Sequence, residues 1–321
     1  MCIRDSTTAA SNFSSLCHVR IALVELGNTG IHLNISAAGR SHTRCQHLNL
    51  GASVSSHGSF VEEDIAAMTA LVTEFMTAIK VHNCQRVFGV ATESFRLAAN
   101  GQAVAAHVER ETGCQIRILT PEEENSLNWQ AAAGSAATLD QLTVLSLNGG
   151  TLGITQGPAN STMPVSTHSF PLGVNILAPR TTPDGYLPAS TRIRIERHIG
   201  ETLKSEFGTP KTVQVALLGE MSAGLATLIH TMRRSEVPEN VTGLTLDCAD
   251  LGHLIKTFED MSLRARLALP GICPRRAPHM PLGATILRQA LRSIGANTAT
   301  VRTVGLKDSI FRKLAVEAKA A

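Results

Sequence analysis

Two short turns rich in glycine and small polar residues are suited to binding phosphate. Their members are Gly27, Asn28, Thr29 and Gly30, and further along the chain Asn148, Gly149, Gly150 and Thr151. Small residues let backbone N–H groups approach an anion closely, so two such turns facing each other would cradle a phosphate chain. Taken alone, residues 27–30 favour an ordinary β-hairpin turn over a phosphate site.

Three consecutive glutamates, Glu122, Glu123 and Glu124, follow Thr120 and Pro121. Thr120 is expected to cap a helix that has Pro121 in its first position. Carboxylates in a first helical turn complement the helix dipole, which would explain all three residues without any chemistry. A carboxylate held near phosphate and other acids can instead have its pKa raised towards the working pH and act as a general base.

Arg96 follows a predicted strand at residues 85–92, and its planar guanidinium suits phosphate because it can bind two oxygens at once. The plain alternative is a surface arginine. Thr92 lies at the end of the same strand, and Asn100 could be no more than the cap of a helix that runs to about residue 111.

The surrounding pattern alternates strands and helices, which favours a partly parallel sheet. Residues 20–26 and 31–36 form a strand, turn and returning strand around the first turn. Ser59 and Glu62 form a predicted capping box before an amphipathic helix over residues 61–80. Strand 142–147, the second turn and strand 152–156 repeat the opening pattern with little residue identity. The repeat predicts two lobes of related architecture.

Composition and charge argue against several classes of function. With 321 residues, two domains are the natural expectation, and a net charge of +3 without long Lys/Arg runs makes nucleic acid an unexpected partner. No stretch reaches the 18 apolar residues of a membrane span, so a cytoplasmic protein without a membrane partner is predicted. The seven cysteines contain no CxxC pair and indicate free thiols in a reducing compartment.

The motifs in their order resemble the exopolyphosphatase and guanosine pentaphosphate phosphohydrolase (Ppx/GppA) family. They are V-E-L-G-N-T-G-I-H-L from Val24, V-A-T-E-S-F-R-L-A-A-N-G from Val90, I-L-T-P-E-E-E-N from Ile118, L-S-L-N-G-G-T from Leu145, P-L-G-V-N from Pro171, L-R-A-R-L-A-L-P-G from Leu263 and R-A-P-H-M-P-L-G-A from Arg276. The resemblance covers about residues 20–310.

The resemblance implies an α/β fold of two ribonuclease-H-like lobes with a cleft between them, as in actin, sugar kinases and heat-shock ATPases. The expected division is an N-terminal lobe of residues 17–134 plus 305–321, and a second lobe of residues 135–304. Residues 1–16 are expected to be a disordered or non-native extension. Members of the family are commonly dimers, so a homodimer is expected.

The resemblance also implies residue roles. Glu124 falls on the catalytic glutamate that activates water, and Arg96 on a phosphate-binding arginine. Phosphate is expected to bind at Gly27, Asn28, Thr29, Arg96, Asn148, Gly149, Gly150 and Thr151. Glu25 stands where the family has a magnesium-binding aspartate, so Mg²⁺, or Mn²⁺ in its place, is the expected cofactor.

The second turn departs from the family's D-I-G-G-G-S-T-E. Ser146 replaces the aspartate and Gly153 the glutamate, which should weaken metal binding because magnesium prefers carboxylate ligands. Near Glu124, Pro121, Asn125 and Ser126 replace the usual residues. Further departures are Glu220 and Met221 in place of a glycine-threonine turn, and Pro278 in place of an aspartate.

Three hypotheses follow. The first is a hydrolase that releases terminal phosphate from polyphosphate or guanosine pentaphosphate. The second is a catalytically degenerate relative that binds polyphosphate or an alarmone such as guanosine pentaphosphate or tetraphosphate, and the missing acids favour it. The third, an ATP-using kinase or ATPase, rests on fold kinship alone and lacks an intact glycine-threonine turn near Gly219.

Overall fold

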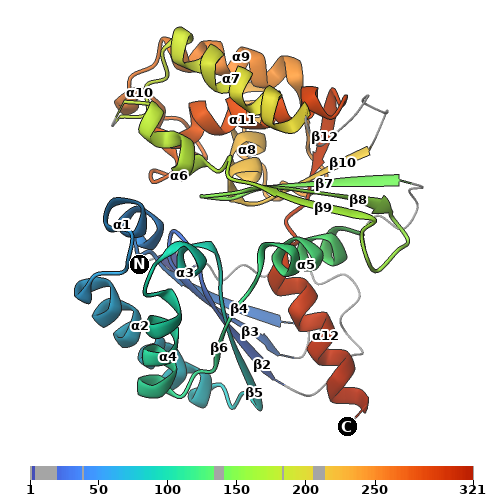
Figure 1. Ribbon diagram of the computed structural model, residues 1–321. Helices are drawn as coiled ribbons and strands as arrows, with labels where there is room; N and C mark the ends of the chain where they lie inside the picture. Colours follow the sequence, from blue (N-terminus) through green and yellow to red (C-terminus); the bar gives the residue numbers. More distant parts are fainter. Residues whose placement is uncertain are drawn as a thin grey trace. The chain divides into compact units, whose positions relative to one another are not determined.

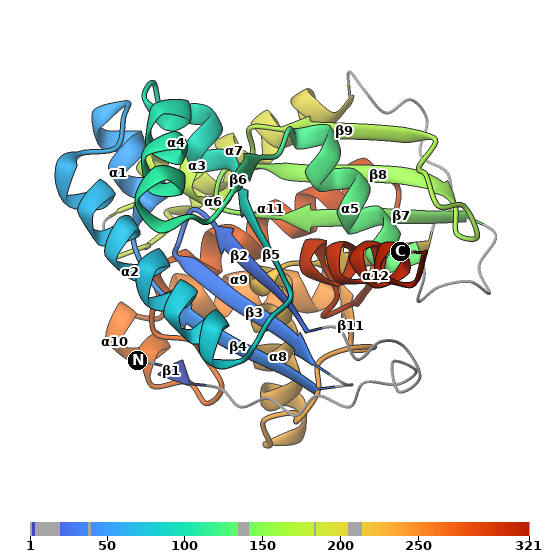
Figure 2. The ribbon, with the colours of Figure 1, turned by 90° about the horizontal axis from the view of Figure 1, so that it is seen from below.

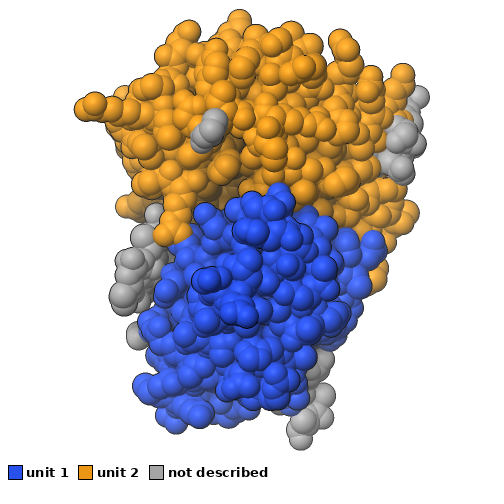
Figure 3. Space-filling model, turned by 60° about the vertical axis from the view of Figure 1, so that its left-hand side comes forward, with its two compact units in different colours: residues 1–124, 306–321 blue, residues 125–305 orange. Residues whose placement is uncertain are grey.

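The computed structural model describes residues 2–3, 20–37, 40–133, 141–182, 184–204 and 214–320. The chain forms two compact units, coloured separately in Figure 3. Unit 1 comprises residues 1–124 and 306–321, and unit 2 comprises residues 125–305. Of the predicted extension at residues 1–16, all but Cys2 and Ile3 lie outside the described part of the chain. Across the described segments, no helix combines the length and apolar character needed to span a membrane.

Unit 1 is built on a six-stranded sheet in the order β1-β4-β3-β2-β5-β6. The strands are β1 (Cys2–Ile3), β2 (Ile21–Leu26), β3 (Ile31–Ala37), β4 (Arg40–Gln46), β5 (Arg86–Ala91) and β6 (Ile116–Ile118). Strand β2 pairs antiparallel with β3 and parallel with β5. Its helices are α1 (Leu50–His57), α2 (Glu62–Val81), α3 (Glu93–Leu97), α4 (Gly101–Thr112), the start of α5 (Pro121–Ala133) and α12 (Leu306–Ala320).

The alternation of side chains along β2 gives this sheet two faces. Ala22, Val24 and Leu26 belong to one core, together with residues of α2 and α4. Leu23 and Glu25 point to the opposite face, where α12 contacts β2. Figures 1 and 2 show α2 and α4 on one side of the sheet and α12 on the other.

Unit 2 repeats this plan with the sheet order β11-β12-β10-β7-β8-β9. The strands are β7 (Gln141–Leu147), β8 (Leu152–Pro158), β9 (Ser166–Phe170), β10 (Gln214–Leu218), β11 (Thr245–Asp247) and β12 (Thr298–Val301). Strand β7 pairs antiparallel with β8 and parallel with β10, as β2 pairs with β3 and β5. The predicted relationship between two strand-turn-strand lobes is therefore confirmed at the level of topology.

Helices pack on both faces of the second sheet, with α5 on one face and α7, α8, α9 and α11 on the other. The helices of unit 2 after α5 are α6 (Val174–Leu177), η1 (Ala178–Arg180), α7 (Ala189–Lys204), α8 (Glu220–Arg234), α9 (Cys248–Glu259), α10 (Leu263–Leu267), η2 (Ala277–His279) and α11 (Met280–Ser293). Leu145 and Leu147 of β7 join the core formed with α7, α8, α9 and α11. Leu142 and Val144 pack on the other face against Trp129 of α5. Ser146 follows in the same alternation and therefore faces α5.

Two predicted helix caps differ from the structure. The capping box of Ser59 and Glu62 is wrong: α2 begins after Val61, whose N–H donates to the carboxylate of Asp64 (3.3 Å). Asn100 does precede α4, but its side chain exchanges two hydrogen bonds with the backbone of Phe60 (2.9 and 2.8 Å) instead of capping the helix. The Asn100 contact joins positions 40 residues apart, whereas the Val61–Asp64 contact lies within the first turn of α2.

Candidate active site

The start of α5 separates the roles of the three consecutive glutamates. The Glu123 N–H donates to Thr120 Oγ1 (3.2 Å), and the Thr120 N–H donates to Glu123 Oε2 (3.0 Å). This reciprocal capping box engages Glu123, which also pairs with Arg117. Glu122 is exposed. Glu124 is therefore the glutamate of this turn that is turned into unit 1.

Arg96 of α3 holds Glu124 from an anchored position. Its Nη1 donates to the carbonyl oxygen of Leu119 (2.6 Å), while its Nη2 donates to Glu124 Oε2 (3.1 Å). The two side chains are only 16% and 12% exposed. Because one nitrogen of the guanidinium is fixed on the backbone, the other is directed at the carboxylate, and a charged hydrogen bond at this burial is stronger than one in water.

The surroundings of the Glu124 carboxylate increase its affinity for a proton. Burial raises the pKa of Glu124 above its usual range, and this is the largest effect. The charge and hydrogen bond of Arg96 lower the pKa, whereas the carboxylates of Glu25 and Glu93 raise it. Three carboxylates of unit 1 thus lie within electrostatic reach of one another, with Arg96 beside one of them.

The turn at residues 27–30 is connected to this group of acidic residues. Asn28 Nδ2 donates to Glu93 Oε2 (2.5 Å), which ties the turn to the start of α3. Glu25, on the last part of β2, is half-buried and pairs in register with His32 and Val90. Thr29 at the turn itself is exposed.

The carbonyl oxygens of this turn accept hydrogen bonds from the chain that follows β4. Gly51 N–H donates to the oxygen of Asn28 (2.8 Å), and Leu48 N–H donates to that of Thr29 (3.1 Å). Gly27 N–H closes the turn on the oxygen of Gly30 (2.9 Å). Carbonyl oxygens would repel phosphate, so holding them against the neighbouring segment favours anion binding at the turn.

The second turn has the same bracing in unit 2. The oxygens of Asn148, Gly149 and Gly150 accept from the N–H groups of Val174 (3.2 Å), Asn175 (2.5 Å) and Gly173 (2.9 Å), respectively. Gly173 lies so close to Gly150 that a Cβ would overlap the backbone of Gly150. The P-L-G-V-N motif therefore positions the turn, and its glycine is required for the close approach.

Positions 146 and 153, where the family resemblance led us to expect carboxylates, carry neutral residues. Ser146 and Gly153 pair in register on β7 and β8. A Cβ at Gly153 would overlap Asn125 Oδ1 and would lie 2.5 Å from Ser146 Oγ. Asn125 is 5% exposed, and its Nδ2 donates to the carbonyl oxygen of His168 (3.2 Å). The Asn125 amide thus takes the space that a longer side chain at position 153 would need.

A family model described as the Ppx/GppA phosphatase family matches residues 40–317 of the chain. The chain belongs to the Ppx/GppA phosphatase family. Exopolyphosphatase 1 of Mycobacterium tuberculosis is 25% identical over 94% of this chain and 90% of its own length. Exopolyphosphatase 1 of Mycobacterium leprae is also 25% identical, over 94% of this chain and 91% of its own length.

Solved structures show the same fold. An exopolyphosphatase from Cytophaga hutchinsonii superposes with a TM-score of 0.81 at 20% identity, covering 93% of this chain and 98% of its own. The Ppx/GppA member of Aquifex aeolicus superposes with a TM-score of 0.76 at 22% identity, over 94% and 98% of the two chains. The predicted α/β fold of two lobes, each a mixed sheet with helices, is confirmed.

The Ppx/GppA family is generally dependent on a divalent metal, but the residues of this member do not fit a resident metal site. Among the residues that the structure describes, no three His, Cys, Asp or Glu side chains gather closely enough to hold a metal ion. In unit 1, Glu93 already accepts from Asn28. In unit 2, Ser146, Gly153 and Asn125 offer no carboxylate. Mg²⁺ prefers several oxygen ligands including carboxylates, so a tightly held ion is not expected here.

Two further family motifs in unit 2 have structural roles. Arg266 of L-R-A-R-L is fully buried, and it donates to the carbonyl oxygens of Asp184 (2.7 Å), Ala277 (3.1 Å), Gly185 (3.3 Å) and Pro278 (3.4 Å). Burial lowers the pKa of the Arg266 guanidinium. Arg276 pairs with Glu220 (2.5 Å) at the start of α8. Gly219, with φ +96°, still makes the tight turn between β10 and α8.

Sequence reasoning missed three contributors to the candidate site. Glu93 anchors Asn28, Gly173 braces the second turn, and Asn125 fills the space beside Gly153. Glu93 and Gly173 stand inside motifs that the sequence displayed. The signal for Asn125 was that positions 125 and 153 both depart from the family pattern. The small residue at position 153 makes room for the larger residue at position 125.

Proposed function

We propose that this protein is a phosphoanhydride hydrolase that releases the terminal phosphate of inorganic polyphosphate, with guanosine pentaphosphate as the alternative substrate. The observation that carries the proposal is the buried Arg96–Glu124 pair, a base of raised pKa beside a phosphate-binding side chain. The exopolyphosphatases that match 94% of the chain support the choice of polyphosphate.

In the proposed reaction, Glu124 removes a proton from a water molecule while the oxygen of that water attacks the terminal phosphorus. The bond between this phosphorus and the bridging oxygen breaks, and its electron pair stays on the shortened chain as a phosphate oxygen. Glu124 then loses its proton to solvent. Arg96 stabilises the charge on the transferred group, and the amides of the braced turn at residues 27–30 bind phosphates that are not transferred.

A resident metal does not enter this mechanism, because the described residues provide no site for one. We propose that Mg²⁺ or Mn²⁺ arrives as the counter-ion of the polyphosphate substrate, and that Glu25 is the carboxylate of the first turn that contacts it. Magnesium often keeps most of its waters and binds through substrate phosphates with one or two carboxylates, so a single protein ligand is chemically adequate for transient contact.

The second candidate function is polyphosphate binding without turnover. It is favoured by the neutral group formed by Ser146, Gly153 and Asn125, which leaves less charge to stabilise the developing negative charge of the reaction. Under this proposal the braced turns bind the chain and Glu124 serves only as the partner of Arg96.

The deciding experiment measures phosphate release from polyphosphate and from guanosine pentaphosphate with Mg²⁺ or Mn²⁺. Glu124→Gln should lower the rate by about 10²- to 10⁴-fold, the usual contribution of a general base. Glu122→Gln is the matched control, because Glu122 is an exposed acid of the same helical turn, and it should keep the wild-type rate. Equal rates for wild type and Glu124→Gln would exclude the hydrolase mechanism. Polyphosphate binding by the wild type with no release would establish the second candidate.

A further inference from the structure

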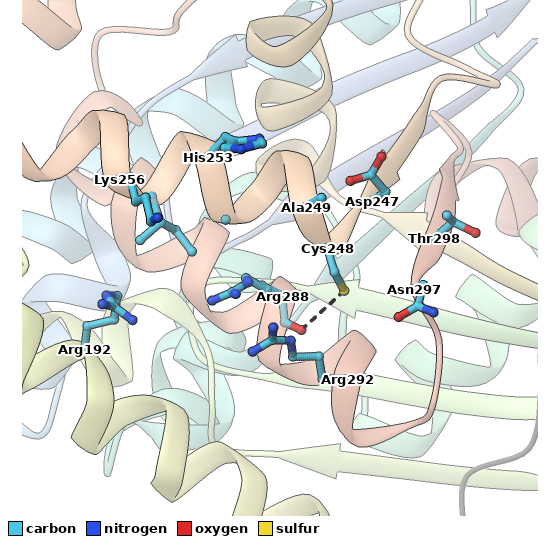
Figure 4. A pocket seen from close by; sticks show the side chains of 12 residues that line it. Arg192, Asp247, Cys248, Ala249, His253, Lys256, Arg288, Arg292, Asn297 and Thr298 are labelled. Carbon is cyan, nitrogen blue, oxygen red and sulfur yellow. Dashed lines mark hydrogen bonds between the residues drawn. The ribbon is translucent and has the colours of Figure 1, made fainter.

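A pocket of about 550 Å³ opens in unit 2 among α7, α9 and α11 (Figure 4). It shares no residue with the second phosphate turn or with residues 146–153. The pocket is lined by Arg288 and Arg292 near the end of α11, whereas the start of that helix, at Met280, packs in the central core of the unit. Met280 and Arg292 are twelve positions apart on α11, which corresponds to roughly 18 Å along the helix axis. The pocket therefore lies at the opposite end of α11 from Met280.

The lining of this pocket is strongly basic. Arg192 comes from α7, Lys256 from α9, and Arg288 and Arg292 from α11, while Asp247 is the one acidic residue that lines it. Asp247 is already engaged, because it accepts from the N–H of Asp250 (2.6 Å) as the cap of α9. The pocket therefore has a net positive charge.

Two of these cations are held in place by acids behind them. Arg192 pairs with Glu196 and with Glu259, both at 3.2 Å, and Arg288 pairs with Glu196 at 3.5 Å. Lys256 and Arg292 are exposed, and no carboxylate in the described part of the chain lies within ion-pair distance of either. Arg192 and Arg288 are thus held in position by their acids. Lys256 and Arg292 can bind an anionic ligand without breaking an existing salt bridge.

The geometry brings the guanidinium groups to the same side of the pocket. Arg288 and Arg292 stand one helical turn apart on α11 and therefore share a face. The guanidinium of Arg288 lies 3.4–3.5 Å from the point where a Cβ would stand at Gly252, so the absence of a side chain there lets it lie against α9. Its Nε is buried and has no hydrogen-bond acceptor. Figure 4 shows both guanidinium groups beside each other, with Lys256 and Arg192 across the pocket.

We propose that this pocket is a second anion site, which binds the phosphate groups of a small, multiply charged phosphate compound. Guanidinium forks match phosphate oxygens, and cations from three helices suit two or three linked phosphates better than a single one. The volume lies within the range of small-molecule sites. Binding would supply counter-charge to Lys256 and Arg292, since Arg192 and Arg288 already pair with Glu196 and Glu259. The proposal does not depend on turnover at Glu124.

The test compares the equilibrium binding of inorganic tripolyphosphate and of guanosine triphosphate by titration calorimetry. The test variant is Lys256→Ala with Arg292→Ala. The matched control is Arg234→Ala with Arg264→Ala, which removes the same charge from exposed positions of unit 2 that do not line this pocket. Thermal unfolding of each variant establishes that it is folded.

Cys248 gives a readout of location, because its thiol is partly buried in this pocket whereas Cys273 lies outside it. Burial raises the pKa of the Cys248 thiol, so alkylation is followed at alkaline pH and mapped by mass spectrometry. A ligand in the pocket should slow the alkylation of Cys248 and leave that of Cys273 unchanged.

We expect at least one of the two ligands to bind the wild type and the control pair equally, and the test variant about tenfold or more weakly for each cation removed. If only inorganic tripolyphosphate binds, the site is assigned to inorganic phosphate chains. If guanosine triphosphate binds more tightly than tripolyphosphate, the site is assigned to nucleotides. Equal affinity of the test variant and the wild type for both ligands would overturn the proposal. Phosphate release by the Glu124 variants is measured separately, so the two proposals can fail independently.

Discussion

Asn125 Oδ1 occupies the space into which any side chain at Gly153 would project. The two positions are therefore coupled, and Gly153→Ala should lower the free energy of unfolding by about 1–3 kcal/mol, the usual cost of overpacking. Combining it with Asn125→Ala should cost less than the sum of the two single changes, because the overlap is removed. Urea unfolding of the four proteins in this cycle measures the coupling, and strict additivity would contradict it.

Building a metal site at residues 146 and 153 requires three changes. Ser146→Asp with Gly153→Glu supplies two carboxylates, but the glutamate has no room until Asn125→Ala vacates the space. The triple variant should bind Mn²⁺ more tightly than the wild type, because the ion gains two oxygen ligands from carboxylates. Calorimetry or Mn²⁺ electron paramagnetic resonance can compare the triple variant with the double. A double variant that binds as well as the triple would show that Asn125 does not obstruct the site.

Ionised Glu124 should reduce the stability of the fold at neutral pH. Its pKa is raised in the folded protein, so between the unfolded and folded pKa values the folded state binds more protons. Stability consequently falls as pH rises through that interval and stays lower above it. Glu124→Gln, which mimics the neutral acid, should unfold at higher urea concentration than the wild type near pH 7. Below the usual pKa of glutamate the difference should disappear.

If Glu124→Gln and the wild type differed in stability by the same amount at every pH, that difference would not arise from the ionisation of Glu124. Glu122→Gln again serves as control, since Glu122 is exposed and its substitution should leave the pH dependence unchanged. Stabilisation together with lost phosphate release is the pattern expected when a site is maintained at the expense of stability.

Arg266 should be essential for the packing of unit 2 and should have no direct part in phosphate binding. Arg266→Leu removes the donors from four backbone carbonyls around residues 184–185 and 277–278, so a loss of about 3–5 kcal/mol is expected. Arg264→Leu changes an exposed arginine of the same helix and should cost little. Polyphosphate affinity should be the same for both variants where they are folded, and a selective loss of affinity in a stable Arg266→Leu protein would refute the structural role.

Much of the local structure was predictable because its causes are short in range. The strand-turn-strand elements around residues 27–30 and 148–151, and the helix that starts after Thr120, all follow from residues within four positions of one another. The prediction that Glu124 differs from its neighbours came from the family resemblance, and the capping box of Thr120 and Glu123 supplies the physical basis for that difference.

The misjudged positions depend on partners that are distant in sequence. Asn100 binds the backbone of Phe60, 40 residues earlier, and Asp64 in the first turn of α2 accepts from Ser53, 11 residues earlier, as well as from the Val61 N–H. None of these contacts leaves a periodic signal in the chain.

The sequence by itself determined the family, the repeated α/β topology and the candidates Arg96 and Glu124, because motifs, turns and amphipathic periods are properties of neighbouring residues. Only the tertiary structure decided that Arg96 and Glu124 are paired and that Asn125 occupies the space that a side chain at position 153 would need. It also decided that basic residues of α7, α9 and α11 line one pocket. Sheet pairing and helix packing create these juxtapositions, since they bring together side chains that the chain order keeps apart.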